Sequence, residues 1–259
     1  MFGKNQIIKA RYGDGETLRV VKIFGTIQGE GPFTGQPAIF VRLAGCNLRC
    51  WFCDTDFETN AKEMSTADIV HEINAARREV KTRLVVITGG EPLAQQLIPL
   101  CYALLIAGLD IQIETAGSVC PPDWSTVSLE SITGRPEWSR GSLTIVCSPK
   151  TPKVDPTIAR ICKDWKYLVS SSPDDVDPAD GLPFTNTQDK DGRRANLFRP
   201  PPDGGTIWIQ PLERYLPTVD GDLVPDEEET KATLAFVSSL SRQYGYRISL
   251  QTHKILDVE

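Results

Sequence analysis

The sequence predicts an α/β protein built on a mainly parallel sheet. From Ile39 onward, short apolar runs alternate with segments of helical periodicity, which is the pattern of repeated βα units. The apolar runs are dense enough for burial on both faces, as in a parallel sheet. A length of 259 residues suits one α/β barrel.

The apolar runs predict seven strands. They fall at residues 38–44, 83–90, 110–115, 142–148, 165–170, 206–210 and 247–253.

Three helices are expected between these strands. Ser65 is followed three residues later by Asp68, a capping start for an amphipathic helix over 65–80. A second helix is expected over 95–106. The third begins in "DEEETKATLAFVSSL", where acidic residues suit the helix dipole, and Gly245 is its expected end.

Two segments interrupt this alternation. Residues 119–141 and 174–205 are rich in Pro, Gly, Ser and Asp, so we expect them to be surface excursions. The sequence has no internal repeat. We therefore interpret residues 1–259 as a single domain with two loop insertions.

Composition narrows the possible partners. A net charge of −6 and a pI near 5.1 disfavour a nucleic-acid-binding surface, which needs clustered Lys and Arg. No apolar run approaches the roughly 20 residues that span a bilayer, and the first residues lack a signal-like segment. We expect a cytoplasmic protein that binds a small molecule, without a nucleic-acid or membrane partner.

Polar residues stand at the ends of most predicted strands. In a parallel barrel these ends form the reactive face. Gln112 and Glu114 alternate with Ile111 and Ile113, so one face of that strand is polar. The pattern predicts a cavity lined by polar side chains, and its members are Arg42, Thr88, Glu91, Glu114, Ser148, Lys150, Gln210 and His253.

Arg42 is the most informative of these residues because it lies within an apolar strand. A buried guanidinium needs an acceptor to offset its desolvation. A substrate carboxylate and an internal ion pair satisfy this requirement equally well.

Cys46, Cys50 and Cys53 crowd one loop, "AGCNLRCWFCDT". A zinc site usually has four ligands, and the nearest histidine, His71, lies on the expected polar face of its helix. A four-iron, four-sulfur cluster held by three cysteines would instead leave one iron open to an exogenous ligand. Zinc and iron-sulfur remain alternatives on spacing alone.

The cysteine spacing CxxxCxxC, together with "TGGEP" at residues 88–92, resembles the radical S-adenosylmethionine superfamily. "TIQGEG", "IETAG", "CSPK", "QPL" and "LQTHK" extend the resemblance from Thr26 to Lys254, to the 7-carboxy-7-deazaguanine synthase family. The resemblance implies a partial (β/α)6-type barrel with an N-terminal extension. The two insertions depart from the family pattern.

The resemblance also implies an activity. Members convert 6-carboxy-5,6,7,8-tetrahydropterin to 7-carboxy-7-deazaguanine with loss of ammonia, in 7-deazapurine (queuosine) biosynthesis. They use a 4Fe-4S cluster, S-adenosylmethionine and Mg²⁺, an electron donor such as flavodoxin, and a homodimeric assembly. The competing hypotheses are an activase of glycyl-radical enzymes, which would not need "QGEG", "SPK" and "QTHK", and a non-catalytic iron-sulfur or zinc module.

The resemblance assigns roles residue by residue and leaves the chemistry to the cluster and the cofactor rather than to a catalytic side chain. The metal ligands are Cys46, Cys50 and Cys53 for the cluster and Thr55 for Mg²⁺. The S-adenosylmethionine set is Phe52, Cys53, Asp54, Gly90, Glu91, Glu114, Ser148, Pro149, Lys150 and Gln210. The substrate set is Ile27, Gln28, Gly29, Glu30, Arg42, Thr88, His253 and the terminal Glu259.

Overall fold

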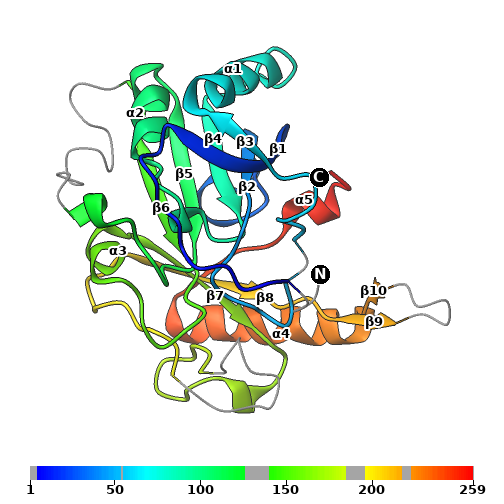
Figure 1. Ribbon diagram of the computed structural model, residues 1–259. Helices are drawn as coiled ribbons and strands as arrows, with labels where there is room; N and C mark the ends of the chain where they lie inside the picture. The colour runs from blue at the N-terminus through cyan, green and yellow to red at the C-terminus, as the bar shows by residue number, and fades with distance from the viewer. Residues whose placement is uncertain (1–4, 54, 126–139, 185–195, 218–222, 259) are drawn as a thin grey trace.

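A sheet of nine strands, in the order β11-β8-β7-β6-β5-β4-β2-β1-β3, organises the computed structural model (Figure 1). The structure describes residues 5–53, 55–125, 140–184, 196–217 and 223–258. The strands from β2 through β4 to β8 are paired in parallel, as is the short β11. The expected α/β class and partial barrel are confirmed.

The strands are β1 Thr17–Ile27, β2 Pro37–Leu43, β3 Lys62–Ser65, β4 Leu84–Gly89, β5 Asp110–Thr115, β6 Leu143–Cys147, β7 Asp164–Val169, β8 Thr206–Pro211, β9 Tyr215–Pro217, β10 Leu223–Pro225 and β11 Arg247–Ile248. The α-helices are α1 Thr66–Ala76, α2 Ile98–Ile106, α3 Pro156–Ile161, α4 Glu227–Tyr244 and α5 Thr252–Ile255. Short 3-10 turns are η1 Gly31–Phe33, η2 Pro92–Ala94, η3 Pro122–Ser125 and η5 Pro173–Asp175.

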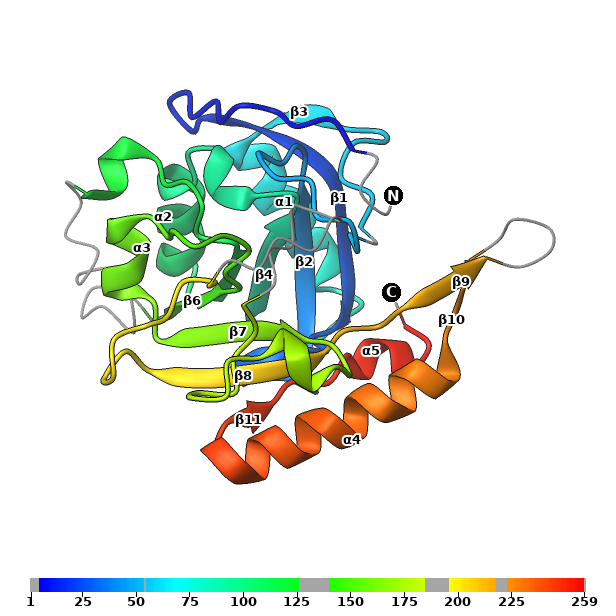
Figure 2. The ribbon, with the colours of Figure 1, turned by 90° about the horizontal axis from the view of Figure 1, so that it is seen from below.

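The sheet curves strongly between its two ends, so that β1 and β2 run in a very different direction from β7 and β8 (Figure 2). Helices α1, α2 and α3 lie on the convex side, and α4 lies along β8 and β11. Apolar side chains such as Ile87, Ile113 and Trp165 fill the space between sheet and helices and are fully buried. The concave side is left for a cavity.

Strand β1 was not expected from the sequence. It pairs antiparallel with both β2 and β3 and so extends the parallel sheet at its N-terminal side. Leu18 and Val20 are buried while Thr17 and Arg19 are exposed, a period-two alternation typical of a half-covered strand. This alternation was the available signal.

The helix predictions agree with the structure except at their ends. The Ser65 hydroxyl accepts a hydrogen bond from the Asp68 amide (3.1 Å), as the capping pattern predicts, but α1 ends at Ala76 rather than at residue 80. Helix α2 starts at Ile98 rather than at residue 95, because residues 95–97, which follow the 3-10 turn η2, are not helical. Helix α4 ends at Gly245, whose φ of 76° is the left-handed conformation that glycine tolerates.

The last predicted strand is wrong beyond Ile248. The chain turns after β11, and α5 follows, so His253 lies on a short helix rather than at a strand end. The reason is a contact with a distant segment, because the Thr252 amide donates to the Gly29 carbonyl oxygen (3.1 Å) instead of to a neighbouring strand.

The expectation that both insertions are surface excursions is wrong for their described flanks. Trp124 is 0% exposed and donates its indole N–H to the Gln96 side chain (3.2 Å). Leu182 and Leu197 belong to the main core, and Arg199 is bonded to Asp180. Residues 126–139 and 185–195 lie outside the described residues.

A hairpin lies outside the main sheet. Strands β9 and β10 form a hairpin that projects from the body and was not predicted (Figure 2). Across the described ranges, no helix combines the length and apolar character needed to cross a bilayer.

The turn after β4 depends on glycine. Gly89 has φ 130°, and a Cβ there would lie 2.1 Å from the Leu43 carbonyl oxygen of the adjacent strand β2. The Gly90 amide donates to that same oxygen (3.2 Å), and the Glu91 amide donates to the Gly45 oxygen (2.9 Å). The "GGE" turn and the start of the cysteine loop are therefore joined by main-chain hydrogen bonds.

Gly89→Ala should destabilise the apoprotein by about 3 kcal/mol or more, because both φ and the Leu43 contact exclude a side chain. Urea unfolding provides the measurement. Gly13→Ala is the matched control, since Gly13 also has positive φ but open space around it, and should cost about 1 kcal/mol. Equal losses in the two variants would contradict the close-approach argument.

Candidate active site

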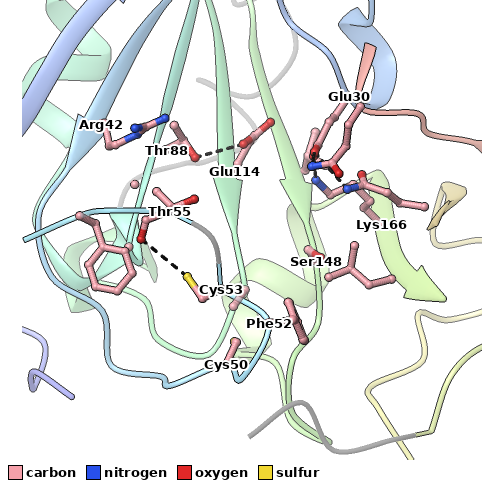
Figure 3. A pocket seen from close by; sticks show the side chains of 18 of the residues that line it. Glu30, Arg42, Cys50, Phe52, Cys53, Thr55, Thr88, Glu114, Ser148 and Lys166 are labelled. Atoms are coloured by element: carbon pink, nitrogen blue, oxygen red, sulfur yellow. Dashed lines mark hydrogen bonds and ion pairs between the residues drawn. The ribbon is translucent and has the colours of Figure 1, made fainter. Parts of the chain in front are cut away.

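A cavity of about 470 Å³ opens at the C-terminal ends of the parallel strands, on the concave face of the sheet (Figure 3). We call it the central cavity. Of the residues that the sequence assigned to a site, those that line it are Ile27, Gln28, Glu30, Arg42, Cys46, Cys50, Phe52, Cys53, Thr55, Thr88, Gly90, Glu114, Ser148, Lys150, Gln210 and His253.

Five assigned residues do not appear in this lining. Gly29 packs against His253, where an added Cβ would lie 2.0 Å from the ring Nδ1. The side chain of Glu91 is buried behind the cavity wall, and Pro149 is buried beside Ser148. Asp54 and Glu259 lie outside the described residues, although the preceding Val258 reaches the cavity.

The cysteine loop supplies three thiols to one wall of the central cavity. Cys46, Cys50 and Cys53 are half-buried thiols, and the Leu48 amide donates to Cys46 Sγ (3.4 Å). Burial raises the pKa of Cys46 to about 12 in the metal-free chain. Three soft sulfur donors on one loop fit a 4Fe-4S cluster.

The described residues hold no group of three His, Cys, Asp or Glu side chains arranged around a single ion. A cubane cluster does not need such convergence, because each thiolate binds a different iron at a different corner. The separated thiols of this loop therefore match the requirement of a cluster better than that of a zinc ion.

An N-terminal strap, residues 5–8, is hydrogen-bonded to the cysteine loop. The Asn5 side-chain N–H donates to the Leu48 oxygen (3.0 Å), Arg49 Nε donates to the Asn5 oxygen (2.8 Å), and the Ile8 amide donates to the Cys46 oxygen (2.8 Å). Asn5 is 2% exposed and also lines the cavity. Sequence reasoning missed this strap, which carries no motif.

Asn5→Ala should loosen the cysteine loop, since it removes one hydrogen bond worth about 1 kcal/mol. Thiol modification of the metal-free protein should become about 5-fold faster at this loop. Gln6→Ala is the control, because the Gln6 side chain is exposed and the hydrogen bonds described between the strap and the cysteine loop do not involve it. Identical modification rates in both variants would show that the strap does not hold the loop.

Glu91 fastens the "GGE" turn to the end of β5. Its carboxylate accepts hydrogen bonds from the Thr115 hydroxyl (2.5 Å) and from the amides of Ala116 (2.8 Å) and Leu93 (3.0 Å). Burial raises the pKa of Glu91. The structure thus gives this side chain a positioning contact, and the backbone of Gly90 is what the turn presents to the cavity.

Arg42 forms no ion pair with any described residue, and its Nε is buried without an acceptor. Its guanidinium lies 5.2 Å from the ring centre of Phe24, and its Cα pairs with that of Thr88 on β4. Of the two alternatives left open by the sequence, the internal ion pair is absent from the described structure. The unused donor suits an anionic ligand.

Glu114 lies at the centre of a polar network in the middle of the sheet. Its Oε1 accepts from Gln28 Nε2 and from Gln112 Nε2 (both 2.9 Å), and its Oε2 accepts from the Thr88 hydroxyl (3.1 Å; Figure 3). A carboxylate offers about four acceptor positions. One position of Glu114 therefore remains for a ligand.

Glu30 lies at the centre of a second network. Its Oε1 accepts from Gln210 Nε2 (3.0 Å) and Gln251 Nε2 (2.9 Å), and its Oε2 is paired with the Lys166 ammonium (Figure 3). Burial alone would raise the pKa of Glu30, but the charge and hydrogen bond of Lys166, aided by Gln251 and the charge of His253, hold it at about 2.

Sequence reasoning missed Lys166 and Gln251 as site residues. Lys166 stands in the middle of β7, between Trp165 and Tyr167, which face the core on the other side of the sheet. A lysine flanked by buried aromatic residues in a strand was the available signal, because period two sends it to the opposite face.

Lys150, a predicted cofactor contact, donates to the Ser148 carbonyl oxygen (3.0 Å) and to its hydroxyl. Burial lowers the pKa of Lys150. Lys150 lines the central cavity, as predicted for a cofactor contact.

Comparison with known proteins agrees with this geometry. Residues 41–125, which contain the cysteine loop and the "GGE" turn, match the model of the radical S-adenosylmethionine superfamily. Over all 259 residues the chain is 41% identical to the full length of the 7-carboxy-7-deazaguanine synthase of Rhodospirillum rubrum. The chain belongs to the 7-carboxy-7-deazaguanine synthase family.

A second sequence relative supports membership of this synthase family, and a solved structure supports the fold. The whole chain aligns at 32% identity with 96% of the 7-carboxy-7-deazaguanine synthase of Rickettsia prowazekii. The crystal structure of QueE from Escherichia coli superposes with a TM-score of 0.59 at 24% identity, over 90% of this chain and 93% of that one, which supports the fold. Membership of the radical superfamily implies a 4Fe-4S cluster and S-adenosylmethionine.

Proposed function

We propose that the chain is a 7-carboxy-7-deazaguanine synthase, a radical lyase that converts 6-carboxy-5,6,7,8-tetrahydropterin to 7-carboxy-7-deazaguanine and releases ammonia, in 7-deazapurine (queuosine) biosynthesis. The observation that carries the proposal is that one cavity combines three groups: a three-thiol loop, a guanidinium without an ion-pair partner among the described residues, and a buried carboxylate. These are the groups needed for a radical cofactor and for a substrate with both a carboxylate and an N–H edge.

The cofactors would occupy the cysteine side of the cavity. Cys46, Cys50 and Cys53 would hold the cluster, and Phe52, Gly90, Glu114, Ser148, Lys150 and Gln210 would surround S-adenosylmethionine. The cluster and S-adenosylmethionine, when bound, would supply the radical chemistry of the reaction. Asp54, Glu91 and Pro149 keep their predicted roles as expectations from the family resemblance.

The chain's own residues bind and orient the substrate. Arg42 offers an unsatisfied donor to the substrate carboxylate, and Glu30 offers an ionised acceptor to the amine and amide edge. Thr88 lies between Arg42 and Glu114 and so joins the substrate and cofactor sides (Figure 3). Ile27, Gln28, Gly29, His253 and the terminal Glu259 complete the proposed substrate set.

We further propose that Thr55 is a ligand of Mg²⁺. Thr55 lines the cavity close to Cys53, and a hydroxyl oxygen is a suitable hard ligand when water and a substrate carboxylate supply the others. A single threonine cannot hold the ion by itself, so metal binding should depend on the substrate.

The proposed setting of the protein is the cytoplasm, with an electron donor and a second copy of the chain as partners. All seven cysteines are thiols, as expected in the cytoplasm. A one-electron donor such as flavodoxin would reduce the cluster. Exposed Leu216, Leu223 and Val224 on the hairpin are apolar surface of the kind that a second copy covers in a homodimer. The comparisons favour neither a glycyl-radical activase nor a non-catalytic metal module.

The reconstituted protein should form 7-carboxy-7-deazaguanine when incubated anaerobically with reductant, S-adenosylmethionine, Mg²⁺ and the carboxypterin. Cys50→Ala should abolish the product and the visible absorption of the cluster, because it removes one iron ligand. Cys120→Ala, which changes a thiol outside this loop, should retain both. Failure of the wild-type protein to form product despite full iron and sulfide loading would overturn the proposal.

A further inference from the structure

We propose that Lys166 is a positioning residue that keeps Glu30 in place as an ionised acceptor, and that the substrate's N–H edge is recognised through this pair. The inference rests on the proposed function. It assigns a role to a residue that no motif of the sequence indicated.

The position of Lys166 cannot be explained by solvation. It lies in the middle of β7 with 8% of its surface exposed, on the cavity side of the sheet, beside Trp208 of β8 in register. A buried ammonium is costly unless it is paired. Its partner is the Glu30 carboxylate, 136 residues earlier in the chain.

The surroundings of Glu30 show what the pair does. Gln210 and Gln251 donate hydrogen bonds to Oε1, and the Lys166 ammonium donates to Oε2. Three donors therefore hold the Glu30 carboxylate in place. One of its roughly four acceptor positions remains, and Glu30 lines the central cavity. A neutral carboxyl group would carry a proton on one oxygen, so it would present a donor there and would accept more weakly than the carboxylate.

Lys166 is the nearest of several charged groups that face Glu30. His253 comes from α5, Lys150 from the segment after β6, and Glu114 from β5, and a Lys254–Glu213 pair lies further along the cavity. None of the other cations is bonded to Glu30 in the described structure. Loss of Lys166 should therefore let burial raise the pKa of Glu30 toward neutrality.

Substrate binding by Lys166→Met should depend on pH. With a raised pKa, Glu30 is ionised above that pKa and protonated below it, so substrate binding in Lys166→Met should improve as the pH rises. In the wild-type protein the pKa of Glu30 is about 2, and Glu30 adds no pH dependence between pH 6.5 and about 9.

The experiment measures KM, kcat and cluster content of Lys166→Met against the wild-type protein from about pH 6.5 to 9. We expect KM for the carboxypterin to rise about 10- to 100-fold at pH 7, as for loss of a hydrogen bond to a charged group, with kcat changed less than about 3-fold. Part of the KM increase should disappear at pH 9. Lys163→Met, three residues earlier and exposed, should match the wild type.

A double variant tests whether Lys166 acts through Glu30. If it does, Glu30→Gln combined with Lys166→Met should have the KM of Glu30→Gln alone, without the pH dependence. A further 10-fold increase in the double variant would overturn the inference, since Lys166 would then act separately. The double variant also serves if Lys166→Met fails to fold, because it leaves no buried carboxylate without a cation.

A purely structural ion pair gives a different result. It would lower the melting temperature and the cluster content of Lys166→Met while leaving KM and its pH profile unchanged, and this outcome overturns the inference. Product formation by the wild-type protein is measured in the same series. Its absence would refute the proposed function, whereas its presence with an unaltered KM in Lys166→Met would refute the role of Lys166 alone.

Discussion

The free-energy cost of burying charged side chains determines how the central cavity is lined. The parallel strands expose one face to an apolar core and the other to the central cavity, so every ionisable side chain on the concave face must find a partner there. Glu30 is paired with Lys166, and Glu114 accepts three hydrogen bonds. Arg42 alone of these lacks a described acceptor, so it is the group most available to an anionic ligand.

Much of the fold and the site could be predicted from the sequence. Seven apolar runs correspond to strands β2, β4 to β8 and β11, and the cysteine loop and "GGE" turn meet at one cavity. Local patterns suffice where a residue's role depends on its own strand. Gln112 and Glu114 are one such case, since period two alone placed both on the polar face.

The predictions that were wrong or missing share a physical cause, which is contact between segments distant in the sequence. Helix α5 replaced a predicted strand because the Thr252 amide bonds to Gly29, over 200 residues away. Lys166 and the Asn5 strap acquire their roles from Glu30 and Leu48, which the sequence does not place beside them. Trp124 is buried in a segment whose composition is typical of a surface loop, because Gln96 accepts its N–H.

The hydrogen bonds that join the "GGE" turn to residues 43–45 involve only main-chain atoms. They continue the pairing of β2 with β4 past the ends of both strands. Amino-acid replacement therefore leaves these donors and acceptors in place, provided that Gly89 is kept. The distance between the cysteine loop and the "GGE" turn is therefore insensitive to which side chains surround them.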